Sequence, residues 1–551
     1  MSKKKKNINK LAEIGPDWAG KIVKLPVLLG IFFCIIVLTS STIGFFTLNP
    51  FLILGLSLVI SFFLFKYIPK YSISKIIPIL AILIFILLAY PVLMITPFYP
   101  ASADAATTTA VRAIGDSIPL DYGQYGKLHM SYQIGFPLIA NVFSDLFPVM
   151  QDFQWIWLLA VLGGVLQLFF FYLFTKELFK SESLGIVSTV LFFSGKLVFE
   201  NLYVGEFAWV FATALMFLFL WLMLKKSSLQ FIVFPTIFVI HPAVGLNLSV
   251  FMTIYYLFNK VGKKHYFLSQ ASRLLVIPII LVNYSLPVIY NALFNQGVFF
   301  HEYTEQSVIY ALVTLTFWVG TGLTLFFAVL LVALLNKTRG KKFFDEYSYL
   351  WIILFVSIAI FIGAVILSTI SVTELIAGRV VELIIISLIL LTALFIKKLN
   401  LEKSKVLLAV IIVVSLFFFF NSSILTHYRS GSKVTLESRE FSQAFYNFDK
   451  EQKVAIFLMQ GGGKIAEYSN KIPFDINQEH SVFSYNFSYY PDEGFEQYET
   501  NSRIRREIIS NHKLELLNDI NVEYIVAKKS FLGINYPIAF EFNDFVVYKR
   551  Q

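Results

Sequence analysis

The chain has 551 residues, of which 57% are hydrophobic and only 15% are charged, and its mean hydropathy is +0.71. This composition excludes a soluble globular protein and indicates a protein that crosses a membrane several times. The formal net charge of +10 does not indicate a nucleic-acid partner, because the basic residues lie beside apolar runs, where anionic lipid and chain orientation account for them. The single cysteine, Cys34, excludes disulfides and Cys-rich metal sites.

Apolar runs long enough to cross about 30 Å of hydrocarbon follow one another through the first three quarters of the chain. They show no alternating ten-residue pattern, so helices are favoured over a β-barrel. The predicted fold class is an α-helical polytopic membrane protein with about thirteen transmembrane helices. The spans are expected at Leu25–Phe46, Pro50–Phe65, Ile76–Thr96, Gln154–Phe174, Leu184–Val198, Phe207–Leu224, Leu229–His241, Ala243–Phe258, Ser272–Tyr290, Ile309–Leu335, Tyr347–Thr369, Ile376–Ile396 and Lys405–Leu425. The pair from Leu229 to Phe258 could form one hairpin or a re-entrant element.

Charge predicts the orientation of these spans, because cytoplasmic loops carry an excess of Lys and Arg. The N-terminal segment 1–24 and alternate connections are basic, with clusters around Lys66, Lys176, Lys225, Lys263, Lys341 and Lys398. The large loop 97–153 and the loop 291–308 are acidic instead. We therefore expect a multi-pass protein of the plasma membrane. Its segment 1–24 would be cytoplasmic, and the domain at 427–551 would be extracytoplasmic.

Residues 427–551 change to mixed charge and predict a small α/β domain that follows the membrane domain at 25–426. Its expected elements are helices at Glu437–Phe448 and Arg503–Leu517 and strands at Lys453–Met459, Val522–Ala527 and Phe545–Tyr548.

The run Gly461–Lys464 follows the first of these strands and superficially matches a phosphate loop. Leu458 and Ile465 stand where that loop has its first glycine and its Ser or Thr. A tight strand-to-helix turn is therefore the preferred interpretation of the run.

The acidic loop begins a few residues after the third span, where Asp104 heads a short helical pattern. An aspartate there can cap the helix by accepting bonds from free backbone amides. A carboxylate beside apolar walls can also have a raised proton affinity and act as a general base. The residues alone leave both interpretations open.

Three further places combine polar groups with the predicted external membrane boundary, where ionisable residues are costly. Glu200 and Glu206 could be solvated loop carboxylates or could gather a divalent cation with Asp104. His241 could end a helix at a histidine-proline turn or donate to a phosphate. Arg379 could be neutralised by Glu382 one turn away or could grip an anionic headgroup with its planar fork.

The pattern resembles the GT-C superfamily of polytopic glycosyltransferases, which use polyprenyl-phosphate-linked sugars. The resemblance is carried by Asp104, by Tyr132–Pro137 entering an amphipathic stretch, by the Gly205–Phe207 turn before a span, and by Gly378–Glu382 near the last spans. The tail is similar to extracytoplasmic tails attached to such enzymes. The resemblance covers nearly the whole chain and implies a GT-C-like membrane domain with an external active site.

On this resemblance, Asp104 is the base that activates an acceptor hydroxyl, and Arg379 and His241 stabilise the departing lipid phosphate. Glu206 and Glu200 would position the acceptor or a cation. Mg²⁺ or Mn²⁺ held by Asp104 and Glu206 is one option, and the sequence alone assigns no cofactor. The expected partners are a polyprenyl-phosphate-linked sugar donor, membrane lipids, and a glycan, lipid or protein acceptor.

Two other classes of protein compete with a glycosyltransferase. A transporter or flippase of lipid-linked saccharides would line a path near the bilayer midplane with polar residues, whereas here they cluster at one predicted surface. A noncatalytic scaffold that displays the tail domain would leave the loop acids without a function. Convergence of the four polar places on one cavity would separate the three classes.

Overall fold

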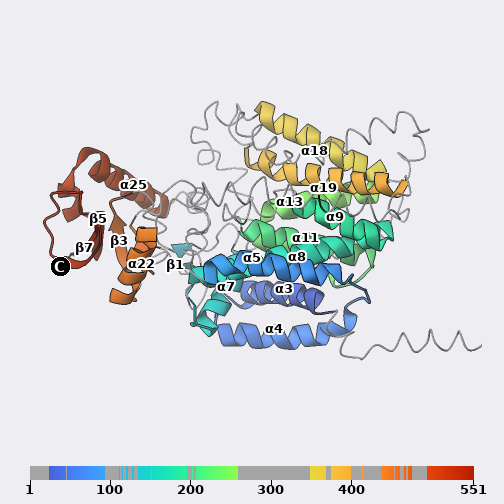
Figure 1. Ribbon diagram of the computed structural model, residues 1–551, viewed down its shortest axis with the longest axis horizontal. Coiled ribbons are helices and arrows are strands. Elements are labelled where there is room, and N and C mark those ends of the chain that lie inside the picture. The colour runs from blue at the N-terminus through green and yellow to red at the C-terminus, as the bar shows by residue number, and fades with distance from the viewer. Residues whose placement is uncertain are drawn as a thin grey trace, which may run out of the picture.

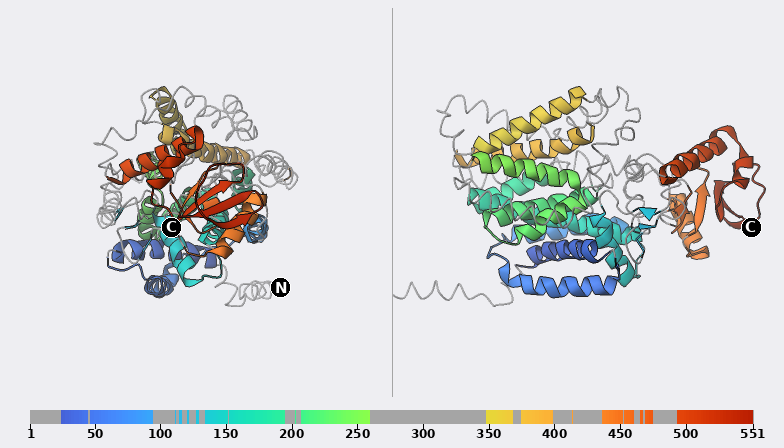
Figure 2. Two further views of the ribbon diagram at one scale, coloured as in Figure 1. Left: turned by 90° about the vertical axis from the view of Figure 1, so that its left-hand side faces the viewer. Right: turned by 180° about the vertical axis from the view of Figure 1, so that it is seen from behind.

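The structure is a computed structural model. It describes residues 24–44, 46–93, 111, 114–115, 120–121, 127–128, 134–150, 152–194, 202, 207–258, 348–367, 374–398, 413, 436–451, 453–459, 465–466, 469–474 and 493–550. These residues form a bundle of long helices and a smaller α/β unit that lies beyond one end of the bundle (Figures 1 and 2).

The first helices of the bundle are α3 (Leu25–Ile43), α4 (Pro50–Leu64) and α5 (Ile76–Leu93). A proline in the first turn and the Asn49 side chain, which accepts a bond of 3.1 Å from the Leu52 amide, start α4. The short 3-10 helix η1 (Phe65–Tyr67) ends it. Most side chains of α4 are exposed, as expected for a helix whose outer face meets lipid.

The middle of the bundle is built from α7 (Gly135–Leu146), α8 (Asp152–Phe179), α9 (Glu182–Ser194), α11 (Phe207–Leu224), α12 (Gln230–Ile240) and α13 (Pro242–Phe258). Helices α18 (Ser348–Leu367) and α19 (Glu374–Lys398) pack against each other on the far side (Figure 1). The α8–α11 pair forms the centre, where almost every side chain of α11 is buried. A helix that is apolar on all sides and buried on all sides belongs to the core of such a bundle.

Glycines let the central helices approach closely. A Cβ on Gly30 of α3 would lie 2.8 Å from both Phe170 and Leu218, and one on Gly163 of α8 would lie 2.8 Å from Phe211. Small residues at helix contacts are typical of membrane bundles, because lipid supplies little hydrophobic drive for helix association.

Aromatic rings also pack between the central helices. The ring centroids of Phe171 and Phe192 lie 4.6 Å apart, as do those of Phe171 and Phe217. These rings join α8, α9 and α11 in one cluster.

Four helices in the described part of the chain are long and apolar enough to cross a membrane by length and composition: Leu25–Ile43, Pro50–Tyr67, Asp152–Phe179 and Phe207–Leu224. Every predicted span that falls on described residues coincides with a helix of the bundle. The helical membrane class is therefore supported. The predicted spans Ser272–Tyr290, Ile309–Leu335 and Lys405–Leu425 lie outside the described residues, apart from Val413.

The pair α12–α13 bends sharply at His241, whose backbone is extended, with φ −154° and ψ 98°. A Cβ on Gly245 would lie 2.7 Å from the Phe238 ring, so the first turn of α13 packs against the last turn of α12. Helix α12 has only 11 residues, which rise about 16 Å. That length is about half of the hydrocarbon thickness, so α12 is too short to cross a bilayer alone.

The C-terminal unit has a five-stranded sheet in the order β4-β3-β5-β7-β6. Strands β3 (Val454–Phe457), β4 (Ile472–Pro473) and β5 (Tyr524–Lys528) are parallel, while β7 (Phe545–Lys549) runs antiparallel to β5 and to β6 (Ile538–Phe542). The predicted α/β class of the tail matches this arrangement.

Two helices cover opposite faces of this sheet. Alternation along β3 sends Ala455 and Phe457 toward α22 (Leu436–Phe448) and Ile456 and Leu458 toward the cluster that includes α25 (Glu493–Asn511). The unit is therefore a three-layer α/β/α sandwich with an apolar core on each face of the sheet.

Candidate functional site

The bundle has one end that is rich in lysine. Lys225 at the end of α11 forms an ion pair with Glu177 of α8. Lys397 in the last turn of α19 donates to the Phe179 carbonyl at 3.1 Å, and Lys176 donates to the Ser72 carbonyl at 3.0 Å. These contacts place the C-terminal ends of α8, α11 and α19 together, and we call this the basic end.

The opposite end therefore holds the starts of α8, α11 and α19. It also holds α7 and the hairpin of β1 (Leu120–Asp121) and β2 (Lys127–Leu128), and the C-terminal unit lies on the same side (Figures 1 and 2). We call it the loop end. The described parts of the acidic loop and of the tail thus lie at the same end of the bundle.

Three of the predicted site residues, Asp104, Glu200 and Glu206, lie outside the described residues. In the chain, Glu206 directly precedes Phe207, the first residue of α11. The divalent-cation site predicted from Asp104 and Glu206 therefore also lies outside the described residues. Within the described residues, no group of three or more His, Cys, Asp or Glu side chains is placed to hold a metal ion.

Arg379 and Glu382 lie in the first half of α19, toward the loop end. A separation of three residues places the two positions on one side of the helix. Their side chains are outside the described part of the structure. The predicted choice between a neutralised pair and a headgroup ligand stays open.

His241 is fully buried at the α12–α13 bend. Its amide donates to the Ile237 carbonyl at 2.8 Å and so closes the last turn of α12. The preceding residue, Ile240, contacts α7, because a Cβ on Gly135 would lie 2.7 Å from its side chain and 2.9 Å from its amide nitrogen. His241 therefore ends a helix, and its bend lies beside the start of α7.

Several polar side chains lie at the junction of α7 and α8, and the sequence did not predict them as site residues. Asn141 Nδ2 donates to Asp145 Oδ2 at 3.0 Å, and the Ser144 hydroxyl donates to Asp152. Burial and the Asp152 carboxylate raise the pKa of Asp145, while the Asn141 amide opposes the rise. The sequence feature that could have indicated this junction is the spacing of Asn141, Ser144 and Asp145, which places them on one side of the amphipathic helix α7.

Aromatic side chains lie beside this junction. Phe143 and Trp155 have ring centroids 5.8 Å apart, Phe147 and Trp155 6.0 Å apart, and the Trp155 indole N–H donates to the Phe147 carbonyl at 2.9 Å. Phe147 and Val149 are exposed. Aromatic rings with a polar tip are typical of the level at which a bilayer meets water. The junction therefore has the aromatic composition that is typical of a membrane boundary.

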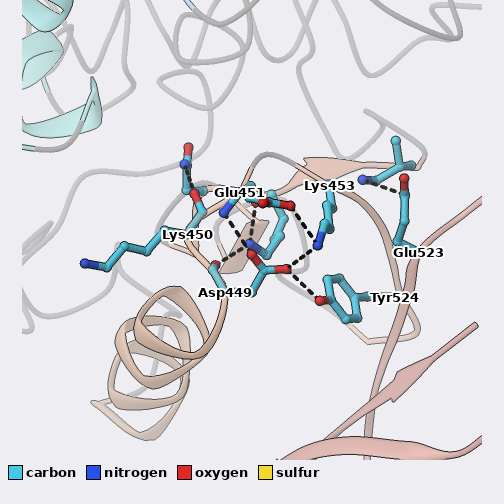
Figure 3. Close-up of polar contacts among 9 residues, drawn as sticks. Asp449, Lys450, Glu451, Lys453, Glu523 and Tyr524 are labelled. Atoms are coloured by element: carbon cyan, nitrogen blue, oxygen red, sulfur yellow. Dashed lines mark hydrogen bonds and ion pairs between the residues drawn. The ribbon is translucent and has the colours of Figure 1, made fainter.

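The C-terminal unit has its own polar network around Asp449, just after α22 (Figure 3). Asp449 accepts from the Tyr524 hydroxyl at 2.6 Å and pairs with Lys453 at 3.1 Å. The buried Lys471 ammonium donates to the carbonyls of Asp449 and Glu451, each at 2.6 Å. A cation at the C-terminal end of a helix satisfies its last carbonyls, so this network joins α22 to the sheet.

No family model matches the sequence, and no curated protein matches it. Among solved structures, the chain is similar to ArnT from Cupriavidus metallidurans in the apo state, with a TM-score of 0.54 and 13% identity. The match covers 86% of this chain and 97% of that chain. At this identity the likeness concerns the fold alone, and it supports an ArnT-like fold for this chain.

Proposed function

We propose that this protein is a membrane glycosyltransferase that transfers a sugar from a polyprenyl-phosphate-linked donor to an acceptor at the loop end. The observation that carries the proposal is the ArnT-like fold over 86% of the chain. The two ends of the bundle add support. Lysines gather at the basic end, whereas the starts of α8 and α19 and the C-terminal unit lie at the loop end.

The proposed mechanism follows from where charge develops during transfer. The sugar gains oxocarbenium character as the lipid phosphate leaves, so the acceptor hydroxyl needs a base on the opposite face of the sugar. Asp104 is the proposed base. Arg379 would stabilise the departing phosphate through its planar fork, and His241 would assist. Glu206 and Glu200 would position the acceptor or a divalent cation.

The positions of the described residues bear on these roles in two ways. Arg379 is five residues into α19 from its first residue, Glu374, a rise of about 7.5 Å, so it lies close to the loop end. His241 is fully buried, so a direct bond to a phosphate would require the α12–α13 bend to open. We therefore give Arg379 the main part in phosphate binding.

The proposal is tested by sugar transfer from a radiolabelled polyprenyl-phosphate sugar in purified membranes. Asp104→Asn keeps the shape of the side chain but cannot take a proton, so transfer should fall by roughly 10² to 10⁴. Asp116→Asn is a matched change in the same loop and should transfer like the wild type. Insertion and expression of both variants should stay normal. Wild-type transfer by Asp104→Asn would refute the assigned base.

Arg379→Lys provides a second test, because it keeps the charge and loses the bidentate fork. We expect a raised KM for the phosphate-linked donor with little change in expression. An unchanged KM would remove Arg379 from the donor site.

A further inference from the structure

The basic end distributes its charge unevenly. Glu177 forms ion pairs with Lys180 and Lys225, and Lys176 lies 3.6 Å from Glu182. These lysines, which belong to α8 or follow α8 and α11, are thus largely neutralised within the protein. The connection between α4 and α5 differs, and we call residues 65–75 the α4–α5 strap.

The strap is fixed to the bundle along its length. Ile68 is buried, and the Tyr71 ring meets the Trp221 ring edge to face at 5.2 Å. The Ser74 amide donates to the Tyr172 hydroxyl at 3.1 Å, and Lys176 donates to the carbonyl and the hydroxyl of Ser72 at 3.0 and 2.9 Å. These contacts hold the strap against the bundle.

The strap displays three exposed lysines: Lys66, Lys70 and Lys75. Among the described residues, none of the three lies within 4.0 Å of a carboxylate. Lys66 lies over the exposed Tyr67 ring, 5.0 Å from its centroid. The strap thus presents positive charge that the described part of the protein does not balance.

Large apolar side chains flank these lysines on both sides. Phe62 and Phe63 in the last turn of α4 are 77% and 62% exposed, and Ile76 and Ile79 in the first turn of α5 are 44% and 58% exposed. A ligand that matches this surface carries a negative headgroup and acyl chains. A soluble anion would match the lysines alone.

We propose that the α4–α5 strap binds an anionic glycerophospholipid at the basic end of the bundle. Lys66, Lys70 and Lys75 attract the lipid phosphate, and the acyl chains lie along the exposed face of α4 or of α5. Basic residues near a membrane surface attract anionic lipid, and their effects add. Because the strap is held by Tyr71, Ser72 and Ser74, little ordering is needed when the lipid binds.

The test is native mass spectrometry of the full-length protein in detergent, titrated with phosphatidylglycerol or with phosphatidylcholine of the same chain length. The wild type should prefer phosphatidylglycerol by about tenfold or more. The variant K66Q/K70Q/K75Q should lose most of this preference. The matched control K450Q/K528Q/K549Q removes the same charge from exposed positions of the C-terminal unit and should keep it.

Additional variants and a competition experiment complete the test. The variant K66R/K70R/K75R should retain the preference, and each single Lys→Gln change should give a partial loss if the triple variant does not fold. Inorganic phosphate, at an ionic strength matched with chloride, should not displace the lipid. A wild type without preference, a strap variant that binds phosphatidylglycerol normally, or displacement by inorganic phosphate would overturn the proposal.

Discussion

The Asp449 carboxylate shows how one residue joins separate elements of the C-terminal unit. Burial opposes its ionisation, but the Tyr524 hydroxyl, the Glu451 amide and the Lys453 ammonium outweigh burial and lower the pKa of Asp449 to about 2. The pKa of Tyr524 shifts in the opposite direction. Burial is the main cause and the hydrogen bond to the Asp449 carboxylate the second, and together they raise the pKa of Tyr524 to about 12. Both groups keep one charge state across the physiological range, so the network serves structure.

Asp449→Asn should destabilise the C-terminal unit by roughly 1–2 kcal/mol at pH 7, because the charged acceptor of three hydrogen bonds is lost. The measurement is hydrogen exchange of peptides covering β3 and β5 in the full-length protein, which should speed up. Glu451→Gln is the control, since the Glu451 side chain is 75% exposed and pairs only with Lys453 among the described residues. Equal exchange in the two variants would contradict the assigned role of Asp449.

The pH dependence of this effect has a definite sign. The folded-state pKa of Asp449 lies below its ordinary value, so the stabilisation is present above pH 4 or so and is lost as the pH falls toward about 2. We therefore expect the difference in urea midpoint between wild type and Asp449→Asn to shrink over that window. A difference that stays constant from pH 6 to pH 2 would show that the carboxylate does not carry the effect.

At the scale of elements, the first residues of α7 fix the position of this helix in the bundle. A Cβ on Gly135 would lie 2.9 Å from the amide nitrogen and 3.0 Å from the Cα of Ile240, and backbone atoms cannot move aside as a flexible side chain can. Phe136 adds ring contacts with Phe207 and Phe211 of α11, at centroid distances of 6.2 and 5.7 Å. This packing sets α7 against α11 and the α12–α13 bend.

Gly135→Ala should therefore displace α7 and cost about 1–3 kcal/mol. The melting temperature of the purified protein in detergent should fall by several degrees. Gly55→Ala on α4 is the matched control, because nothing lies within 4 Å of its added Cβ, and its melting temperature should not fall. A Gly135→Ala protein as stable as this control would show that α7 does not pack as described.

The sequence predicted most elements because their boundaries are local. The span Phe207–Leu224 coincides with α11, since Lys225 and Lys226 end the apolar run directly. The elements of the C-terminal unit were harder to predict. Strand β4 has only two residues, and the exposed edge strand β6 has little apolar alternation, so neither gave a signal. Helix α25 begins at Glu493, ten residues before the predicted start, and ends before His512, whose φ is 53°.

The candidate site was predictable only in part, because its contacts join distant segments. The His-Pro pair indicated the helix end at His241, but not the Ile240–Gly135 contact that brings the bend to α7. The Asp145–Asp152 junction depends on how α7 meets α8, which no local pattern encodes. The roles of Asp104, Glu200, Glu206 and Arg379 remain predictions.

At the scale of the whole molecule, the bundle has opposite chemical character at its two ends. Lys176, Lys225 and Lys397 meet at one end, while α7 and the C-terminal unit lie at the other. The rule that basic residues stay in the cytoplasm then predicts that the loop end faces outward. On the proposed function, the lipid-linked donor would be used on that outer face.

Labelling of single cysteines tests this orientation, in a Cys34→Ala background so that each added thiol is alone. Tyr67→Cys lies at the basic end, and Val149→Cys and Leu532→Cys lie at exposed positions of the α7–α8 junction and the C-terminal unit. A membrane-impermeant maleimide should label the last two on intact cells and Tyr67→Cys only after permeabilisation. Labelling of Val149→Cys and Leu532→Cys from opposite sides would contradict the shared end.

The central claim is sugar transfer at the loop end, and proteoliposomes that contain the purified protein test it most directly. They are supplied with a radiolabelled polyprenyl-phosphate sugar and an acceptor fraction from the cell envelope. We predict labelled acceptor together with an equal amount of free polyprenyl phosphate, and neither product from Asp104→Asn. Movement of the intact donor between leaflets without any transfer by the wild type would contradict the claim and identify a flippase.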